Sequence, residues 1–280
     1  MAVTTTTEMA EAIEKKVSTT LTTVLQQASV ALPTINDRSN EVMPGMDRLD
    51  IILFNELSSQ PVDESTGVSA STIDPSANQL DLDKHESIAW AISQKSSLQS
   101  KVNAVSQAVS QGAVRMAADI DDYIFSLIDA GVSTAAPDHR LQLTANPLED
   151  ISNAKKLLDE ANVSRLDRYI AASPAFVKLL LDDNTIVNAD QFGNSSAREN
   201  GFVTRIHGFT IVESSSPSII DGGFQAYHRE SVAFARQMAI SFSSEYKTLL
   251  HRTEYAMTHL YGAKFLADGV RAVVYDSDGA

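Results

Sequence analysis

Residues 5–30 repeat apolar side chains at spacings of three and four, which predicts an amphipathic helix. Thr5 and Glu8 fit a capping box at its start, and Pro33 ends it. A polar linker, PTINDRSNEVMPG over residues 33–45, follows the helix. A helix with such a linker behind it can pack on its own domain or extend as an arm onto a neighbouring subunit, and both interpretations stay open.

The period changes to two in residues 49–56, LDIILFNE, and in residues 80–92, LDLDKHESIAWAI, and each is predicted to be a strand. The second strand gathers its apolar side chains on one face, namely Leu80, Leu82, Ile88, Trp90 and Ile92. Residues 57–79 between the strands are rich in serine and contain two prolines but no Lys or Arg, which predicts a long tip. The segment is therefore an extended two-stranded ribbon. Because a lone ribbon is marginally stable in water, we expect it to lean on another surface, which another chain could provide.

A second helical stripe begins at Ser97 and ends near Gly131, which is a natural helix C-cap. At about 1.5 Å per residue, this helix would span roughly 45 to 50 Å and would act as a girder for the fold. Gly112, inside the stripe, could bend the helix or let a neighbour approach closely. A coiled coil fits less well, because the stripe is short and its flanking positions carry few charges.

Residues 146–222 predict a compact α+β unit. Asn146 caps a helix that has Pro147 in its first turn. A strand follows at residues 167–173, and Ser173-Pro174 begins a short helix. Phe202, Thr204 and Ile206 then alternate before Gly208 and the strand FTIVES, which predicts a hairpin.

The last third of the chain reads mostly as strands, with one turn at Gly262 and another at Asp268-Gly269. The final strand, VRAVVY over residues 270–275, can pair with earlier strands and close the sheet under the long helix. No internal repeat recurs at a fixed period.

The composition of the chain is typical of an acidic globular protein. Its 280 residues are 43% hydrophobic and 21% charged, and no apolar run approaches the roughly 18 to 20 residues of a membrane helix. The N-terminus lacks the basic start and apolar segment of a secretory signal. The sequence contains no cysteine, which excludes disulfides and thiolate sites and fits a protein of the cytoplasm, where disulfides do not persist. The formal charge of −14 repels phosphate and argues against a sequence-reading nucleic-acid binder. Any self-assembly of such a chain must gain its stability from buried apolar area.

A search for reactive motifs finds none. The histidines are His85, His139, His207, His228, His251 and His259, and no two have the spacing of three or four that places two metal ligands on one helical turn. No nucleophile elbow, phosphate-binding loop or dinucleotide fingerprint is present. Asp121 and Asp122 are adjacent on a helix, so they point in different directions and form no catalytic pair. We therefore assign no catalytic, cofactor-binding or metal-binding residues and expect a structural or binding protein, not an enzyme.

The order of the predicted parts resembles a known family. A helical arm is followed by the entry strand VMPGMDRLDIILF, a long loop, LDLDKHESIAWAI and the helix LQSKVNAVSQAVSQGAVRMAADIDDYIFSLI. RYIAASPAFVKLLLD, GFVTRIHGFTIVES and LYGAKFLADGVRAVVY come later, so the resemblance runs from about residue 15 to the end. This arrangement resembles the major capsid protein of tailed bacteriophages, whose α+β fold, the Hong Kong 97-type, is shared with encapsulins and herpesvirus capsids.

The resemblance implies a domain layout and a function. The layout is an N-terminal arm (1–45), an extended β-ribbon loop (46–95), a peripheral domain with its spine helix (96–145), an axial domain (146–225) and a return to the peripheral domain (226–280). The implied function is self-assembly of hexamers and pentamers, hundreds of copies in all, into an icosahedral shell around double-stranded DNA that is not bound sequence-specifically. Scaffolding, portal and decoration proteins are the other implied partners, with no membrane involved. The chain would be made in the bacterial host cytoplasm and reside in the virion.

Two alternatives stay open at this point. The first is an encapsulin-like compartment, in which the same fold encloses an enzyme cargo. The second is a non-shell phage structural or adhesion module, which would remain near the mass of a single chain or a small multiple of it.

Overall fold

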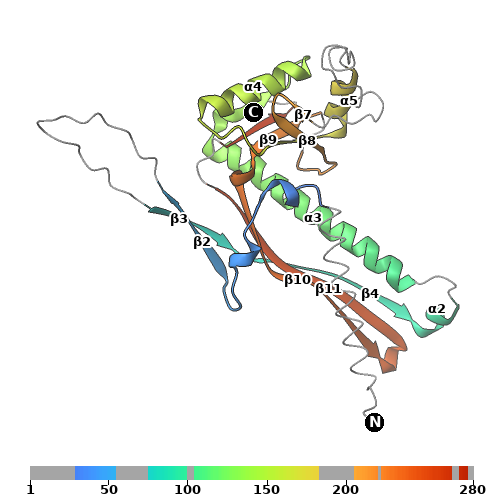
Figure 1. Cartoon of the computed structure of the whole chain (residues 1–280). Coiled ribbons are helices and arrows are strands. Elements are labelled where there is room, and N and C mark those ends of the chain that lie inside the picture. Colours follow the sequence, from blue (N-terminus) through green and yellow to red (C-terminus); the bar gives the residue numbers. More distant parts are fainter. Residues whose placement is uncertain are drawn as a thin grey trace, which may run out of the picture.

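The computed structural model describes residues 29–54, 75–99, 104–182, 205–219, 222–266 and 271–276, and the description below refers to these. Within them the chain forms two sheets, a separate two-stranded ribbon and four α-helices (Figure 1). The predicted helix of residues 5–30 lies outside the described residues except for its last two positions. The tip of the ribbon and the predicted turn at Asp268-Gly269 also lie outside them. No described helix is long and apolar enough to cross a membrane.

A six-stranded mixed sheet forms one end of the molecule. Its strand order is β5 (Arg140–Gln142), β12 (Ala272–Asp276), β9 (Phe224–His228), β6 (Arg168–Ala172), β8 (Phe209–Glu213) and β7 (Arg205–Ile206). The β12–β5 and β6–β8 pairs are parallel, and the other pairs are antiparallel. The final strand thus pairs with earlier strands, as the sequence predicts.

Helices cover both faces of this sheet. The long helix α3 (Ala104–Ala135) packs on one face, and α4 (Pro147–Glu160) and α5 (Pro174–Asp182) pack on the other (Figure 1). Strand β12 shows the alternation that this sandwich requires. Val274 joins the core under α3, whereas Val273 and Tyr275 join the core under α4 and α5. Every residue of β12 is buried, which explains its unbroken apolar run.

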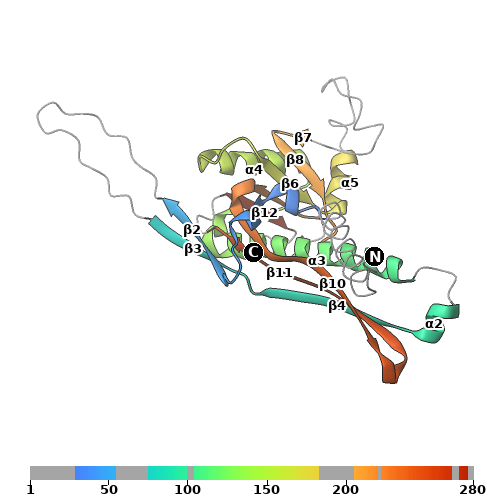
Figure 2. The same ribbon diagram turned by 60° about the horizontal axis from the view of Figure 1, so that its bottom comes forward.

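A four-stranded sheet extends away from this end, alongside α3 (Figures 1 and 2). Its order is β1 (Asn36–Asp37), β10 (Val232–Lys247), β11 (Arg252–Phe265) and β4 (Lys84–Ser93), and the short helix α2 (Gln94–Gln99) follows β4. One face packs against α3 through Phe234, Met257 and Tyr261, in the same core that reaches the six-stranded sheet. The two sheets therefore share α3 as a common support.

The structure contains the predicted two-stranded ribbon, but the paired strands are shorter than the sequence predicts. β2 (Arg48–Phe54) pairs antiparallel with β3 (Pro75–Asp81), from Arg48 opposite Asp81 to Phe54 opposite Pro75. The predicted second strand, 80–92, is wrong as a single strand, because residues 84–93 leave the ribbon and pair with β11. The root of the ribbon packs its apolar face on Ala233, Ala235 and Leu266 of its own chain. The root of the ribbon is therefore supported by residues of the same chain.

Gly262 explains the break between β3 and β4. The predicted turn there is wrong, since Gly262 lies inside β11, and the hairpin instead closes at Thr248–Leu250. A Cβ atom on Gly262 would overlap the backbone carbonyl of Asp81 and lie 3.1 Å from the Cα of Leu82. Glycine in a strand marks either a bend or a close backbone approach, and here it allows the chain to cross directly over β11.

The predicted long helix is described in two parts, α2 and α3, with residues 100–103 outside the described residues, and its predicted end is wrong. α3 continues four residues past Gly131, so that glycine is not a cap. A Cβ there would overlap the ring of Phe265, and a Cβ on Gly112 would overlap the end of the Met257 side chain. Both glycines therefore bring strand β11 close to the helix.

Several local predictions are confirmed. α4 begins at Pro147, and its cap Asn146 accepts a hydrogen bond from the Glu149 amide at 3.4 Å. β6 lies within residues 167–173, and α5 starts at Pro174. The β7–β8 hairpin turns at Gly208 with φ of +93°, a left-handed conformation that glycine adopts without strain. Phe202 and Thr204 of the predicted hairpin lie outside the described residues.

Candidate functional site

The ionisable side chains of the described residues serve the architecture and form no reactive cluster. No three His, Asp or Glu side chains in this part of the chain lie close enough together to hold a metal ion. The His139 ring nitrogen lies 3.0 Å from the Ala272 carbonyl, and His228 accepts a hydrogen bond from the Glu230 amide at 3.2 Å. These two imidazoles thus have local structural partners.

The candidate site is instead the set of junctions that join the outlying segments to α3. Asp121 makes the first of them. It is buried, and it accepts hydrogen bonds from the Ser29 hydroxyl, from the Val30 amide at 2.8 Å and from the Ala31 amide at 3.1 Å. Burial raises the pKa of Asp121, and these three hydrogen bonds only partly oppose that rise. This carboxyl group fixes the point at which the N-terminal segment joins the body.

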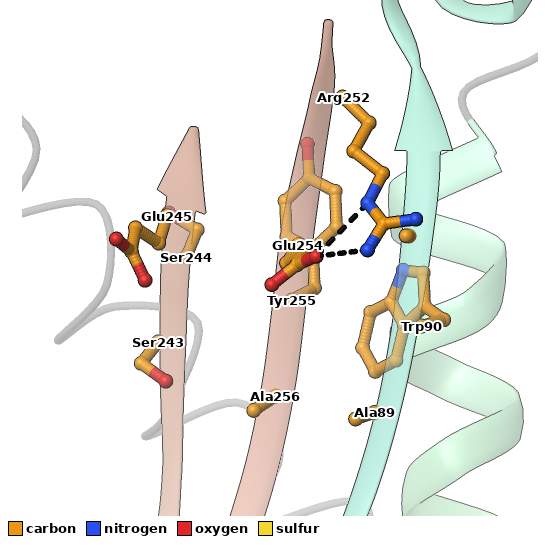
Figure 3. A pocket seen from close by; sticks show the side chains of 10 residues that line it. Ala89, Trp90, Ser243, Ser244, Glu245, Arg252, Glu254, Tyr255 and Ala256 are labelled. Carbon is orange, nitrogen blue, oxygen red and sulfur yellow. Dashed lines mark hydrogen bonds and ion pairs between the residues drawn. The ribbon is translucent and has the colours of Figure 1, made fainter. Parts of the chain in front are cut away.

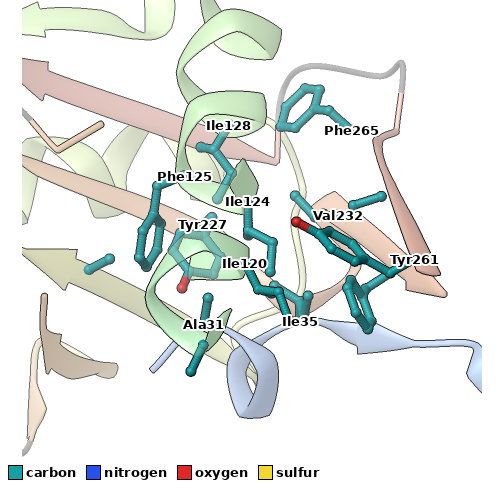
Figure 4. Close-up of a cluster of buried hydrophobic side chains, with 14 of the residues drawn as sticks. Ala31, Ile35, Ile120, Ile124, Phe125, Ile128, Tyr227, Val232, Tyr261 and Phe265 are labelled. Carbon is teal, nitrogen blue, oxygen red and sulfur yellow. The ribbon is translucent and has the colours of Figure 1, made fainter. Parts of the chain in front are cut away.

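Residues 29–37 then run through the main core. Ala31 and Ile35 lie between α3 and the strands, beside Tyr227 and Val232 (Figure 4). The hydroxyl groups of Thr34 and Tyr227 are 2.7 Å apart, and burial raises the pKa of that tyrosine. β1 pairs in parallel with β10 at the end of the segment. The root of the predicted arm is thus an integral part of the fold.

Asp122 makes a second junction on the same turn of α3. It accepts hydrogen bonds from the Ser216 hydroxyl at 2.7 Å, the Ser218 amide at 3.1 Å and the Ser218 hydroxyl at 2.5 Å. Burial acts to raise the pKa of Asp122, but the hydrogen bonds from Ser218 and Ser216 outweigh it and lower the pKa. The two adjacent aspartates therefore hold different segments.

A third junction joins β4 to β11 and α3. Glu86 accepts a hydrogen bond from the Tyr261 hydroxyl at 3.1 Å and faces Nε2 of the buried His259 at 3.1 Å. Burial lowers the pKa of His259, although Glu86 opposes that effect, so the ring is neutral near pH 7 and donates its Nε2 proton. Lys84 Nζ lies 4.9 Å from the centre of the Tyr123 ring on α3. Sequence reasoning missed this cluster, because Glu86 lies 173 residues from His259 in the chain.

A groove of about 580 Å³ lies on the four-stranded sheet (Figure 3). Ala89, Ala256 and Ser243 line it side by side in neighbouring strands. Arg252 donates to Glu254 at 2.6 and 2.9 Å near the end of the hairpin. The lining combines small side chains with the aromatic rings of Trp90 and Tyr255, which gives a surface suited to packing.

A family model described as phage capsid protein matches residues 77–272, which is more than half of the chain. The chain belongs to the phage capsid protein family. The match includes α3, α4, α5 and most strands of both sheets, whereas β1 and all but the first residue of β12 lie outside it.

Solved structures agree with that assignment at the level of the fold. A structure from Mycobacterium phage Che8 has 20% identity and a TM-score of 0.71, covering 90% of this chain and 92% of that one. The capsid of cyanophage P-SCSP1u has 16% identity, a TM-score of 0.71 and 86% coverage of both chains. The capsid of cyanophage Pam1 has 15% identity and a TM-score of 0.68, covering 89% and 91%. No curated protein sequence matches. The predicted Hong Kong 97-type α+β fold of this capsid protein is confirmed.

Proposed function

We propose that this phage capsid protein assembles as hexamers and pentamers into an icosahedral shell that encloses double-stranded DNA. The observation that carries the proposal is the two-sided ribbon. Ile51 faces the body and is 1% exposed, whereas the next residue, Ile52, is 57% exposed on the opposite side. A ribbon that is clamped at its root, projects from the body and carries an exposed isoleucine on its free side fits a contact with a neighbouring copy (Figure 1).

The domain layout belongs to the same proposal. We assign residues 1–45 to the arm, 46–95 to the extended loop and 96–145 to the peripheral domain with α3 as its spine. Residues 146–225 form the axial domain, to which β12 adds a strand from the returning segment 226–280. The Asp121 and Ile35 contacts support an arm whose root is fixed in the body.

Apolar burial is sufficient to overcome the charge of the chain. Obligate interfaces commonly bury upwards of about 2,000 Å², and at about 25 cal/mol per Å² of apolar area this gives tens of kcal/mol before ordering costs. Repulsion between subunits of charge −14 is screened over about 8 Å at physiological salt. An acidic chain also holds packaged DNA weakly, which favours later release of the genome.

The remaining parts of the proposal concern location and partners. The chain is made in the host cytoplasm and resides in the virion, with scaffolding, portal and decoration proteins as further partners. It carries no enzymatic activity, in keeping with the structural role of its family.

Electron microscopy of the purified chain tests this function. We expect closed shells with five-fold vertices, and shells isolated from infected cells should contain DNA that nuclease digests only after the shells are opened. Shells filled with protein would instead support the encapsulin-like alternative. Particles no larger than a few chains of 30.3 kDa at any concentration would contradict the proposal.

A further inference from the structure

A buried histidine connects the edge strand β4 to the interior of the four-stranded sheet. His259 is 1% exposed and lies between Met257 and Tyr261 on the face of β11 that packs under α3. Its Nε2 atom is 3.1 Å from Glu86 Oε2, and the two residues lie directly opposite each other in the pairing of β11 with β4. The shell function makes no use of this pair, although a buried imidazole is the side chain most suited to respond to pH.

Strand β4 has few other attachments. It is the last strand of its sheet, so among the described strands only β11 pairs with it (Figure 2). Glu86 also accepts a hydrogen bond from the Tyr261 hydroxyl at 3.1 Å, and the rings of Tyr261 and His259 are 4.8 Å apart. The chain enters β4 directly from the ribbon strand β3. The state of the His259–Glu86 pair therefore affects how firmly the first half of β4 is held.

Charged and titratable groups surround the pair on all the elements that pack against it. They are Lys84 on β4, Tyr261 on β11, Arg236 on β10, and Tyr123, Asp119 and its ion-pair partner Arg115 on α3. Burial lowers the pKa of His259, whereas Glu86 and Asp119 act to raise it and Arg236 acts to lower it. Because the net effect lowers the pKa, the ring takes up a proton more readily when water reaches it than when it is buried.

We propose that the His259–Glu86 pair is a pH-sensitive latch, which holds β4 against β11 and α3 while the imidazole is neutral and releases β4 when acid protonates the ring. The arrangement in which the ring is solvated binds the proton more tightly, so acid shifts the equilibrium toward that arrangement. In the proposed shell, release of β4 would loosen the strand that leads from the ribbon. That consequence rests on the proposed function, whereas the latch is a property of the single chain.

Trp90 reports on the position of β4, because it is the only tryptophan of the chain. It lies on the same face of β4 as Glu86, packs against the core under α3 and stacks on Tyr255 with ring centres 5.6 Å apart. Release of β4 should expose this ring to water and shift its fluorescence emission to longer wavelength. We expect that shift on acidification, with a midpoint below about pH 6.5, the ordinary pKa of histidine, and with an unchanged far-ultraviolet circular dichroism spectrum.

Two substitutions separate a latch from a merely structural contact. His259→Gln keeps a side-chain donor near Glu86 but does not titrate, so the emission of Trp90 should stay constant. Glu86→Gln removes the charge that favours the imidazolium, so the midpoint should move to lower pH. The matched control is His85→Gln, at an exposed residue on the opposite face of the same strand, and its transition should match that of the natural chain.

The proposal is overturned if the emission of the natural chain does not move with pH, or if His259→Gln moves as the natural chain does. A shift that coincides with loss of the circular dichroism signal would also overturn it, because the whole chain would then be unfolding. If His259→Gln does not fold, Glu86→Gln decides, and an unmoved midpoint contradicts the latch. The titration of dissociated chains tests the latch even where electron microscopy shows no shells, so the failure of one proposal is distinguishable from the failure of the other.

Discussion

Individual residues decide how the outlying segments of this capsid protein join its body. Asp121 and Asp122 hold the root of the N-terminal segment and residues 216–218, respectively, on one turn of α3. Gly262 leaves room for the crossing of residues 81 and 82 over β11. Neither role involves bond-making chemistry. The first role depends on carboxylate acceptors, and the second depends on the absence of a side chain at Gly262.

The change Gly262→Ala should destabilise the fold, because the added methyl group meets backbone atoms that cannot rotate away. We expect a loss of about 1 to 3 kcal/mol, which is typical of overpacking. Gly112→Ala is the matched control, since its methyl group meets only the flexible end of Met257, and it should change stability by less than about 1 kcal/mol. Urea denaturation measures both, and equal effects of the two changes would contradict the crossing.

The pH dependence of stability should carry the signature of His259 and His228. Burial lowers the pKa of both rings below that of the unfolded chain, so below about pH 6.5 the unfolded state binds more protons. Stability should therefore fall as pH decreases through that value. His259→Gln should flatten the slope while keeping a side-chain donor near Glu86. Thermal melts between about pH 5.5 and 7.5 provide the test, and a slope that the substitution leaves unchanged would rule out His259 as its source.

At the scale of elements, the local chemistry of the sequence predicts more than its long-range crossings. The Asn146 cap, Pro147 and Pro174 act within one helical turn, so α4 and α5 could be predicted with their start points. The predicted alternation holds within each strand but not as one shared face, because Leu80 packs under β10 whereas Ile88 and Trp90 of β4 are partly buried in the core under α3. The sequence could not reveal that the backbone changes sheets at residues 82 and 83. Gly262 alone indicates this crossing in the sequence, and a glycine at that position fits a turn equally well.

The ribbon supports a prediction at this scale. Deleting residues 58–72 keeps both described strands, β2 and β3, and the root contacts of Leu49 and Leu80. The shortened chain should therefore fold with an unchanged circular dichroism spectrum but assemble poorly, because the ribbon loses its reach. Sedimentation after purification compares the two chains. Normal and equally stable shells from the shortened chain would argue against a role of the ribbon between copies.

The molecule as a whole combines a core under α3 with a second core under α4 and α5, and its outlying parts leave some apolar side chains exposed. The core under α3 reaches both sheets and joins them. The apolar residues Ile52 and Leu249 lie at opposite outlying parts and remain exposed. Such a division suits a subunit whose body is complete and whose contacts are supplied by other copies.

Salt should accelerate assembly. Each chain carries a net charge of −14, and added salt shortens the distance over which identical subunits repel one another, from about 10 Å at 0.1 M to about 3 Å at 1 M. Light scattering during assembly at increasing sodium chloride measures the rate. Slower assembly at higher salt would show that attractive ion pairs between copies dominate.

The central claim is that the outlying segments are covered by sister copies. Sedimentation velocity of the purified chain over a wide concentration range tests it most directly. The account predicts a species of megadalton mass that grows with concentration at the expense of small oligomers. A single compact species of 30.3 kDa that persists at high concentration would contradict it.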